Sequence, residues 1–200
     1  MKILVFDTET TGLPSSSLPL DLQPKIIQFA GVLYEVNDEK LMQEIKRVDV
    51  LIDPKIDIPV ETTMIHKITN EMVKGKPIFS KVFSEIRQLF IETDMVCAHN
   101  IAFDKKLLQI ECERLEESFD FWPEKHYDTM LETIDLCRLP SKNRSFKSPR
   151  LSELHEFLFD IDFDNAHNAL FDVLATGKCL QELINRGYAN ISPSNQVSLF

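Results

Sequence analysis

Two carboxylates close to the start of the chain could bind a metal ion together. Asp7 and Glu9 follow a largely apolar segment, residues 2–6, that is typical of a buried strand. Since alternate side chains of a strand point to the same face, both carboxylates are expected to face one point. Two anions so close repel each other unless a cation lies between them, and hard oxygen ligands suit Mg²⁺ or Mn²⁺ better than zinc. A solvated strand end is the alternative interpretation of the same pair.

Two further acids and a histidine lie where helices are expected to begin. Asp104 follows the turn formed by His99 and Asn100, and the dipole of the helix after that turn favours its ionised form. Asp172 lies near the start of a second helix, and on one continuous helix it would be about 140° from His167. We therefore expect His167 in the loop before that helix, where it can swing over the site. Taken singly, each of these residues is also explained as a helix cap or a surface residue.

The elements that must position these residues are strands followed by strands and helices in alternation. Turn residues between the second and third predicted strands indicate a hairpin, so the first three strands are expected to be antiparallel. This order predicts an α/β fold with a mixed five-stranded sheet flanked by helices. Strands are predicted over residues 2–6, 26–36, 41–52, 95–98 and 133–137, and helices over 79–90, 103–115, 151–158 and 169–184, the last capped by Gly187.

Three segments occur in the same order as the motifs of a known nuclease family. They are FDTETTG at residues 6–12, His99-Asn100 with Phe103-Asp104, and His167-x-Ala169-x-x-Asp172. Together they resemble the motifs of the DnaQ-like 3′-5′ exonucleases, the histidine-bearing DEDDh group of ribonuclease T and the epsilon subunit of DNA polymerase III. The resemblance extends from about residue 2 to residue 186. It includes residues 64–69, which are similar to the family's Ile-His-Gly-Ile segment but have Lys67 in place of its glycine.

The resemblance implies a ribonuclease H-like fold and a site for two metal ions. The metal ligands would be Asp7, Glu9, Asp104 and Asp172, holding two Mg²⁺ or Mn²⁺ ions roughly 3.5 to 4 Å apart. His167 would be the general base, because an unperturbed histidine is largely neutral at physiological pH and can accept a proton from the attacking water.

The same resemblance implies contacts with the end of the substrate. Glu61 and His66 would contact the terminal nucleotide, Thr10 would support its approach, and Asn100 would be a further substrate-binding residue. For Glu61 and His66, an exposed pair of loop residues is the alternative interpretation.

The net charge of −10, from 32 acidic and 22 basic side chains, argues against a nucleic-acid partner when it is taken for the chain as a whole. One segment departs from that balance, because residues 140–149 contain no acid. Basic side chains in such a segment can contact phosphates whatever the net charge, and we predict substrate contacts for Lys142 and Arg144, with Lys147 and Arg150 beside them. Binding through so few cations is expected to be weak and sensitive to salt.

The last five residues resemble a second motif. Gln196-Val197-Ser198-Leu199-Phe200 is similar to the bacterial sliding-clamp-binding pentapeptide and follows a polar spacer, residues 192–195. Leu199 and Phe200 would be apolar anchors, and the Gln196 amide would orient the peptide. Such a tether raises the effective concentration of a weakly binding enzyme at DNA, although a coincidentally apolar tail is the alternative. The expected organisation is an exonuclease domain over residues 1–187 and a flexible tail over residues 188–200.

Length and composition bound the class of protein. The chain has 200 residues, of which 44% are hydrophobic and 27% charged, which is typical of one globular domain. Neither a signal peptide nor a membrane span fits the sequence, so we expect a cytoplasmic protein. The four cysteines form no CxxC pair and are expected to be reduced, mostly buried thiols.

The predicted function is a metal-dependent 3′-5′ exonuclease that releases nucleoside monophosphates from single-stranded or frayed DNA ends. It would act in replication proofreading or repair, with the sliding clamp as a partner and a replicative DNA polymerase as a further one. An RNA-trimming exoribonuclease of the oligoribonuclease or ribonuclease T type is the alternative, and the clamp peptide discriminates against it. The presence of every motif acid and the motif histidine argues against a non-catalytic clamp adaptor.

Overall fold

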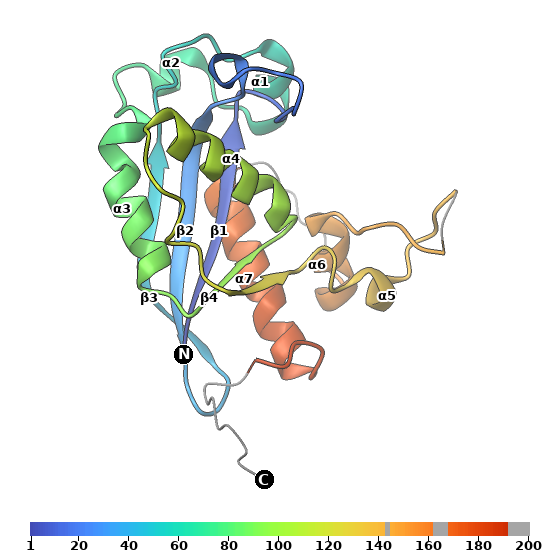
Figure 1. The fold of residues 1–200 in the computed structure, drawn as a ribbon. Coiled ribbons are helices and arrows are strands. Elements are labelled where there is room, and N and C mark those ends of the chain that lie inside the picture. The colour runs from blue at the N-terminus through green and yellow to red at the C-terminus, as the bar shows by residue number, and fades with distance from the viewer. Residues whose placement is uncertain (143–144, 162–167, 192–200) are drawn as a thin grey trace.

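A five-stranded sheet forms the middle layer of the molecule (Figure 1). The computed structural model describes residues 1–142, 145–161 and 168–191. The strands lie in the order β3-β2-β1-β4-β5, with β1–β2 and β2–β3 antiparallel and β1–β4 and β4–β5 parallel. The predicted mixed sheet with three antiparallel strands is thus confirmed. The strands are β1 (Lys2–Thr10), β2 (Ile26–Val36), β3 (Met42–Leu51), β4 (Met95–Ala98) and β5 (Lys125–Asp128).

Helices cover both faces of the sheet (Figure 1). The helices α3 (Phe79–Ile91) and α4 (Ile101–Arg114) pack on one face, and α6 (Leu151–Phe159) and α7 (Ala169–Asn185) pack on the other. Gly187 follows α7 with φ +77° and donates its N–H to Ile184 O at 3.0 Å, as the predicted helix end requires. Three short helices and a 3-10 turn lie in the connections: α1 (Val60–His66), α2 (Asn70–Val73), α5 (Ile134–Cys137) and η1 (Leu20–Leu22).

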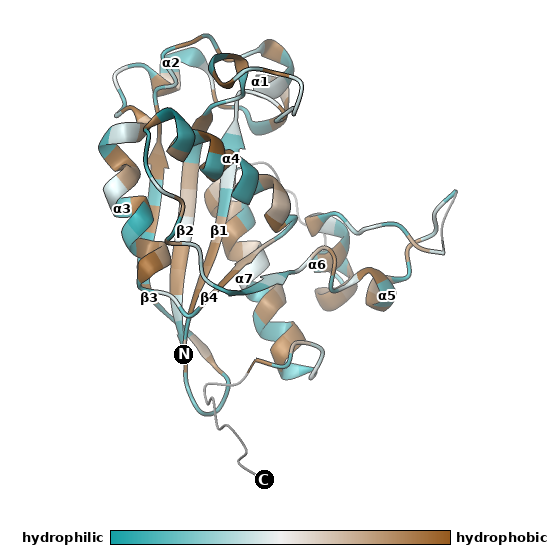
Figure 2. Cartoon of the chain, viewed as in Figure 1, coloured by the Kyte–Doolittle hydropathy of each residue, from teal (hydrophilic) through white to brown (hydrophobic). Residues whose placement is uncertain are grey.

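The side chains of β1 alternate between two cores because both faces of the sheet are covered. Leu4 and Phe6 pack with α3 and α4, whereas Ile3 and Val5 pack with α6 and α7. Figure 2 shows the result, with hydrophobic residues concentrated on the central strands. The residues after Phe6 on β1 continue this alternation, so it determines which face of the sheet each acid at the end of the strand points to.

The fifth strand does not lie where the sequence predicts it. A strand over residues 133–137 is wrong, because Ile134–Cys137 form α5 and the strand is β5, Lys125–Asp128. The reason is that β5 lies at the edge of the sheet and exposes its first two residues, so it lacks the apolar pattern that indicates a strand. The apolar side chains of Leu136 and Cys137 instead join the core around α6 and α7.

The composition-based expectations on cysteines are confirmed. Cys97, Cys112, Cys137 and Cys179 are buried free thiols. Within the described part of the chain, no helix combines the length and the apolar character that crossing a bilayer requires.

Candidate active site

The end of β1 and the start of α7 bring three carboxylates together. Asp7 and Glu9 continue the alternation of Ile3 and Val5, so they face the side of the sheet covered by α7. Asp172 lies in the first turn of that helix. Carboxylate oxygens of Asp7, Glu9 and Asp172 lie within 4.8 Å of one another, and this all-oxygen set has the chemistry of a site for a hard divalent cation.

The fourth predicted acid reaches the same place from the opposite face of the sheet. Asp104 is buried in the first turn of α4. Its Oδ1 accepts hydrogen bonds from the hydroxyl of Thr8 at 2.7 Å and from the N–H of Thr8 at 3.1 Å. Because Thr8 lies between Asp7 and Glu9 on β1, helix α4 is fastened to the strand at the position that the two carboxylates flank.

Asp128, at the end of β5, fixes the start of α4. Its carboxylate accepts hydrogen bonds from the N–H groups of Asn100 and Ile101 at 3.0 and 3.1 Å, two donors that a helix start leaves without partners in the helix. Asn100 has φ +74° and ψ 52°, a left-handed conformation that asparagine adopts more easily than most residues. The strand that sequence reasoning missed therefore sets the position of Asp104.

A cavity of about 520 Å³ opens over these side chains. All four acids lie in its wall, together with Asn100, which the sequence analysis proposed as a substrate contact. Arg150 contributes a cation to the same wall at the start of α6. The remaining lining residues are Thr8, His99, Phe103, Met130, Ser148, Pro149, Leu151 and Ser152.

His99 joins this cavity to the basic segment. Its Nε2 lies 3.0 Å from the carbonyl oxygen of Pro149 and its Nδ1 lies 2.9 Å from Thr129 Oγ1. A carbonyl oxygen only accepts, so Nε2 carries a proton and donates it to Pro149 O. Burial lowers the pKa of His99 below its ordinary value. The ring thus holds Pro149, and with it Arg150, at the edge of the site.

The acids of the cavity carry raised pKa values. Burial, reinforced by the charges of Asp172 and Asp104, raises the pKa of Glu9 to about 8. Burial raises the pKa of Asp104 to about 7, although the hydrogen bonds from Thr8 oppose the shift. The pKa of Asp7 is raised well above its ordinary value by burial and then by the neighbouring acids. Such acids hold protons near neutral pH and release them when a cation binds in their place. The raised pKa values therefore fit a site that binds divalent metal ions.

Four of the predicted substrate contacts lie outside the lining of this cavity, Lys142 of the basic segment among them. Thr10 is buried, and its hydroxyl donates to the carbonyl oxygen of Gly12 at 2.7 Å, which shapes the turn after β1. Glu61 is exposed in the first turn of α1. His66 is buried at the end of that helix, where its Nδ1 accepts from the N–H of Ile68 at 3.0 Å.

Lys67, the residue after His66, stands where the family usually has glycine, and it adopts a conformation that favours glycine. Lys67 has φ +62° and ψ 6°, in the left-handed region that favours glycine. Its N–H donates to Thr63 O at 2.9 Å and closes α1. The glycine usual in the family at this position suits that conformation, and Lys67 adopts the same conformation here at a cost of roughly 1–2 kcal/mol.

The cations of the basic segment have different surroundings. Lys142 is exposed and lies outside the cavity lining. Lys147 forms an ion pair with Glu153 of α6, so part of its charge is neutralised within the protein. Arg150, in contrast, borders the cavity. Arg144, the proposed base His167 and the clamp-peptide residues Gln196, Leu199 and Phe200 lie outside the described residues.

Exposed apolar side chains that no sequence pattern indicated lie in the loop after β1 and on α1. Leu13 is 78% exposed directly after the motif glycine, and Met64 of α1 is 68% exposed beside the half-exposed Ile65. The loop after β1 and α1 lie at the same end of the molecule (Figure 1). The available signal was that a helix of seven residues can bury only one face, which leaves its other apolar residues exposed.

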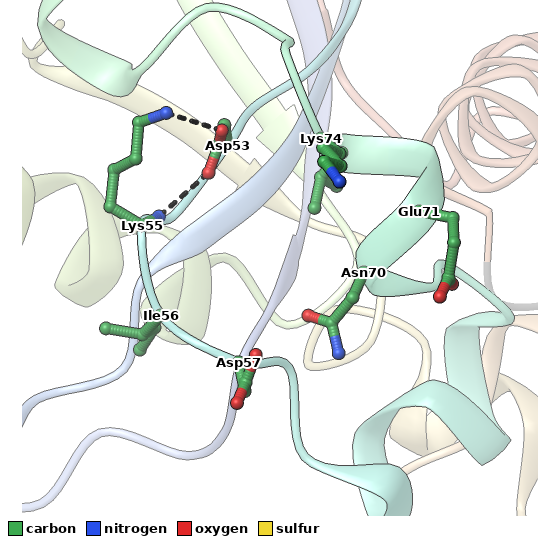
Figure 3. A pocket seen from close by; sticks show the side chains of 8 residues that line it. Asp53, Lys55, Ile56, Asp57, Asn70, Glu71 and Lys74 are labelled. Atoms are coloured by element: carbon green, nitrogen blue, oxygen red, sulfur yellow. Dashed lines mark hydrogen bonds and ion pairs between the residues drawn. The ribbon is translucent and has the colours of Figure 1, made fainter.

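A second hollow lies between the loop after β3 and α2 (Figure 3). There Lys55 Nζ lies 2.7 Å from Asp53 Oδ2, and the N–H of Lys55 donates to Asp53 Oδ1 at 2.9 Å. Asn70 Oδ1 accepts from the N–H of Ile58 at 2.9 Å. The bond between Ile58 and Asn70 holds the loop against α2, whereas Lys55 and Asp53 pair within the loop. These groups do not form a set of ligands directed at one point.

Comparison with known proteins agrees with this geometry. A family model described as an exonuclease, RNase_T, matches residues 4–180. The chain belongs to the RNase_T exonuclease family. Its resemblance to DnaQ-like, DEDDh exonucleases and its ribonuclease H-like fold are thereby confirmed.

The relatives of this exonuclease differ widely in length. A DNA polymerase III of PolC type from Listeria innocua is 30% identical over 180 residues, which is 90% of this chain but only 11% of that protein. Exonuclease I superposes with a TM-score of 0.72 at 19% identity, covering 92% of this chain and 41% of that chain. The nuclease domain of 3′hExo, a DEDDh family member bound to rAMP, gives a TM-score of 0.71 at 17% identity and covers 93% and 92% of the two chains.

Proposed function

We propose that this exonuclease hydrolyses the terminal phosphodiester bond at 3′ ends of DNA and releases nucleoside monophosphates. The observation that carries the proposal is the cluster of Asp7, Glu9 and Asp172, with Asp104 in the wall of the same cavity. Two Mg²⁺ or Mn²⁺ ions bound there would activate the attacking water and stabilise the charge that develops on the phosphate.

The residues around the metal site have distinct parts in this reaction. His167, proposed from its motif, takes a proton from the water that attacks the terminal phosphorus. The bond from that phosphorus to the 3′ oxygen of the preceding nucleotide breaks, and that oxygen leaves with a proton from solvent. Thr8 keeps Asp104 in place through its two hydrogen bonds, and Arg150 offers a charged donor to a phosphate at the cavity edge.

The exposed apolar side chains support a single-stranded or frayed substrate. Leu13 follows β1 and Met64 and Ile65 belong to α1, and the loop after β1 and α1 lie at the end of the molecule where β1 ends (Figure 1). Unpaired bases expose apolar faces that stack on or pack against such side chains, whereas a duplex hides them. Because this contact does not depend on base identity, we expect little sequence preference.

Matched DNA and RNA oligonucleotides distinguish the proposed substrate from the alternative. With Mg²⁺ and 5′-labelled oligonucleotides, we expect DNA to give a ladder of shortened products. DNA should be degraded at least about tenfold faster than RNA of the same sequence, and neither should react in EDTA. His167→Ala should lower kcat by roughly 10²- to 10⁴-fold, the usual contribution of a general base. Faster degradation of RNA would assign the chain to the RNA-trimming class, in keeping with the rAMP-bound neighbour.

The proposed setting is replication proofreading or repair in the cytoplasm, with delivery by a sliding clamp. The relative from Listeria innocua is a DNA polymerase III, which makes a replicative polymerase a further proposed partner. Removal of residues 196–200 should abolish capture by an immobilised bacterial clamp while leaving degradation of short oligonucleotides unchanged. Ser194→Ala, in the spacer, is the control that should retain capture. Clamp binding by the shortened chain would remove the tail from the proposal.

A further inference from the structure

A buried glutamine links the sheet to the start of α7. Gln28 lies on β2 directly opposite Glu9 of β1, and its side chain is only 3% exposed. Its Oε1 lies 3.3 Å from the backbone N–H of Ala169, the first residue of α7. Its Nε2 donates to Asp49 Oδ1 on β3 at 2.8 Å. One side chain therefore connects β3, β2 and α7 beside the carboxylate cluster.

The two partners determine the orientation of the Gln28 amide. A backbone N–H can only donate, so it requires the amide oxygen, and an ionised carboxylate can only accept, so it requires the amide nitrogen. Reversing the amide would place two donors together at Ala169 and two acceptors together at Asp49. Asp49 therefore acts on α7 indirectly, by holding the Gln28 oxygen toward the helix.

The bond to Ala169 acts on the helix turn that carries a proposed metal ligand. The first N–H groups of a helix lack partners within the helix. In α7, Phe171 N–H is accepted by the Asn168 side chain at 3.4 Å, whereas Ala169 N–H is accepted by Gln28 on the sheet. Gln28 thus fixes the end of α7 relative to β1 and β2, and Asp172 lies three residues after Ala169.

The chemical type of this residue follows from its surroundings. An acceptor for the helix N–H is needed opposite Glu9, at the edge of a cluster of carboxylates. A glutamate would accept the same bond, but its charge would face Asp49 and add to the negative charge near Glu9. A neutral amide supplies the acceptor without that repulsion and also supplies the donor that Asp49 accepts.

We propose that Gln28, oriented by Asp49, is a positioning residue that sets Asp172 against Asp7 and Glu9 for metal binding. The inference rests on the proposed function only in taking that cluster as the metal site.

A charge-exchange pair of variants tests the link. Gln28→Glu should weaken Mn²⁺ binding, followed by electron paramagnetic resonance, by roughly tenfold and lower kcat with little change in KM, because repulsion from Asp49 displaces the introduced carboxylate from Ala169 and this displacement outweighs the attraction of the added charge for the cation. Adding Asp49→Asn should restore most of both, because the amide introduced on β3 can donate to the carboxylate introduced on β2 while that carboxylate still accepts from Ala169. Gln43→Glu makes the same charge change at an exposed position of β3 and should bind Mn²⁺ as the unmodified protein does.

The outcomes separate this inference from the proposed function. Absence of both Mn²⁺ binding and nuclease activity in the unmodified chain would contradict the proposed function itself. An active unmodified chain whose Gln28→Glu variant binds Mn²⁺ normally, or is not rescued by Asp49→Asn, would overturn the inference alone. If Gln28→Glu does not fold by circular dichroism, Asp49→Ala at its exposed position takes its place, with an expected loss of roughly two- to fivefold in Mn²⁺ affinity. Unchanged affinity in that variant would overturn the inference equally.

Discussion

Asp7→Asn is expected to reduce the release of nucleoside monophosphates by roughly 10³-fold or more, with Mn²⁺ binding lost in parallel. Asp7 is the acid whose pKa is raised by burial and then by each of the other three acids, so it lies at the centre of their mutual repulsion. Replacing Asp7 removes a charged ligand of the proposed metal site. Stabilisation of the transition state by the metal ions contributes several kcal/mol. Each 1.36 kcal/mol corresponds to a tenfold change in rate.

This variant separates a catalytic effect from a structural one. Asparagine keeps the size of the side chain and removes an acid whose ionised form the neighbouring carboxylates repel, so the variant should melt no lower than the unmodified protein in EDTA. Asp38→Asn, in the exposed turn between β2 and β3, makes the same chemical change away from the site and should leave activity unchanged. Activity of Asp7→Asn within tenfold of the unmodified chain would contradict the assignment of this cluster as the catalytic site.

The acids of the site could be predicted because their positions follow from local rules. The period of two in a strand places Asp7 and Glu9 on one face, and the first turns of two helices carry Asp104 and Asp172. Neither inference needs knowledge of how the elements pack. The sequence did not show that Asp104 bonds to Thr8, because that contact depends on α4 crossing the opposite face of the sheet.

The missed features depend on contacts between distant segments. The strand β5 buries little, so it carries no hydrophobic period, and its importance lies in Asp128, which fixes the start of α4. The sequence identified the basic segment, but it did not show that Lys147 pairs with Glu153 or that Arg150 lies in the cavity wall. Gln28 carries no motif signal at all, because its part depends on the register of β2 with β1.

The stability of the metal-free protein is expected to fall as pH rises from about 5 to 8. Glu9 has a pKa of about 8 in the folded protein, above the ordinary value of 4.5 that applies to the unfolded chain, and Asp104 is shifted in the same direction to about 7. The folded protein therefore binds more protons than the unfolded chain in this range. Their contribution to stability is complete below about pH 4.5 and is lost as pH rises through 8.

Calorimetric melting in EDTA and in Mg²⁺ across this pH range measures the effect. Loss of a few kcal/mol corresponds to a fall in Tm of roughly 5–10 °C for a chain of this size. At pH 8, Mg²⁺ at a hundred times its Kd should increase the free energy of unfolding by about 2.7 kcal/mol and so raise Tm strongly. At pH 5, where protons occupy the carboxylates, Mg²⁺ should raise Tm only weakly.

Glu9→Gln isolates the contribution of the site from that of other titrating groups. The lowered pKa of His99 gives a contribution of opposite sign, which both chains share and which cancels in their difference. In EDTA at pH 8, the variant should melt several degrees higher than the unmodified protein. At pH 5, where Glu9 is protonated, the two proteins should have about the same Tm. Glu39→Gln, at an exposed turn, should follow the unmodified protein at every pH. A Tm in EDTA that is equal for Glu9→Gln and the unmodified chain at pH 8 would show that Glu9 is already ionised without metal, and the repulsion that recruits a divalent cation would then be absent.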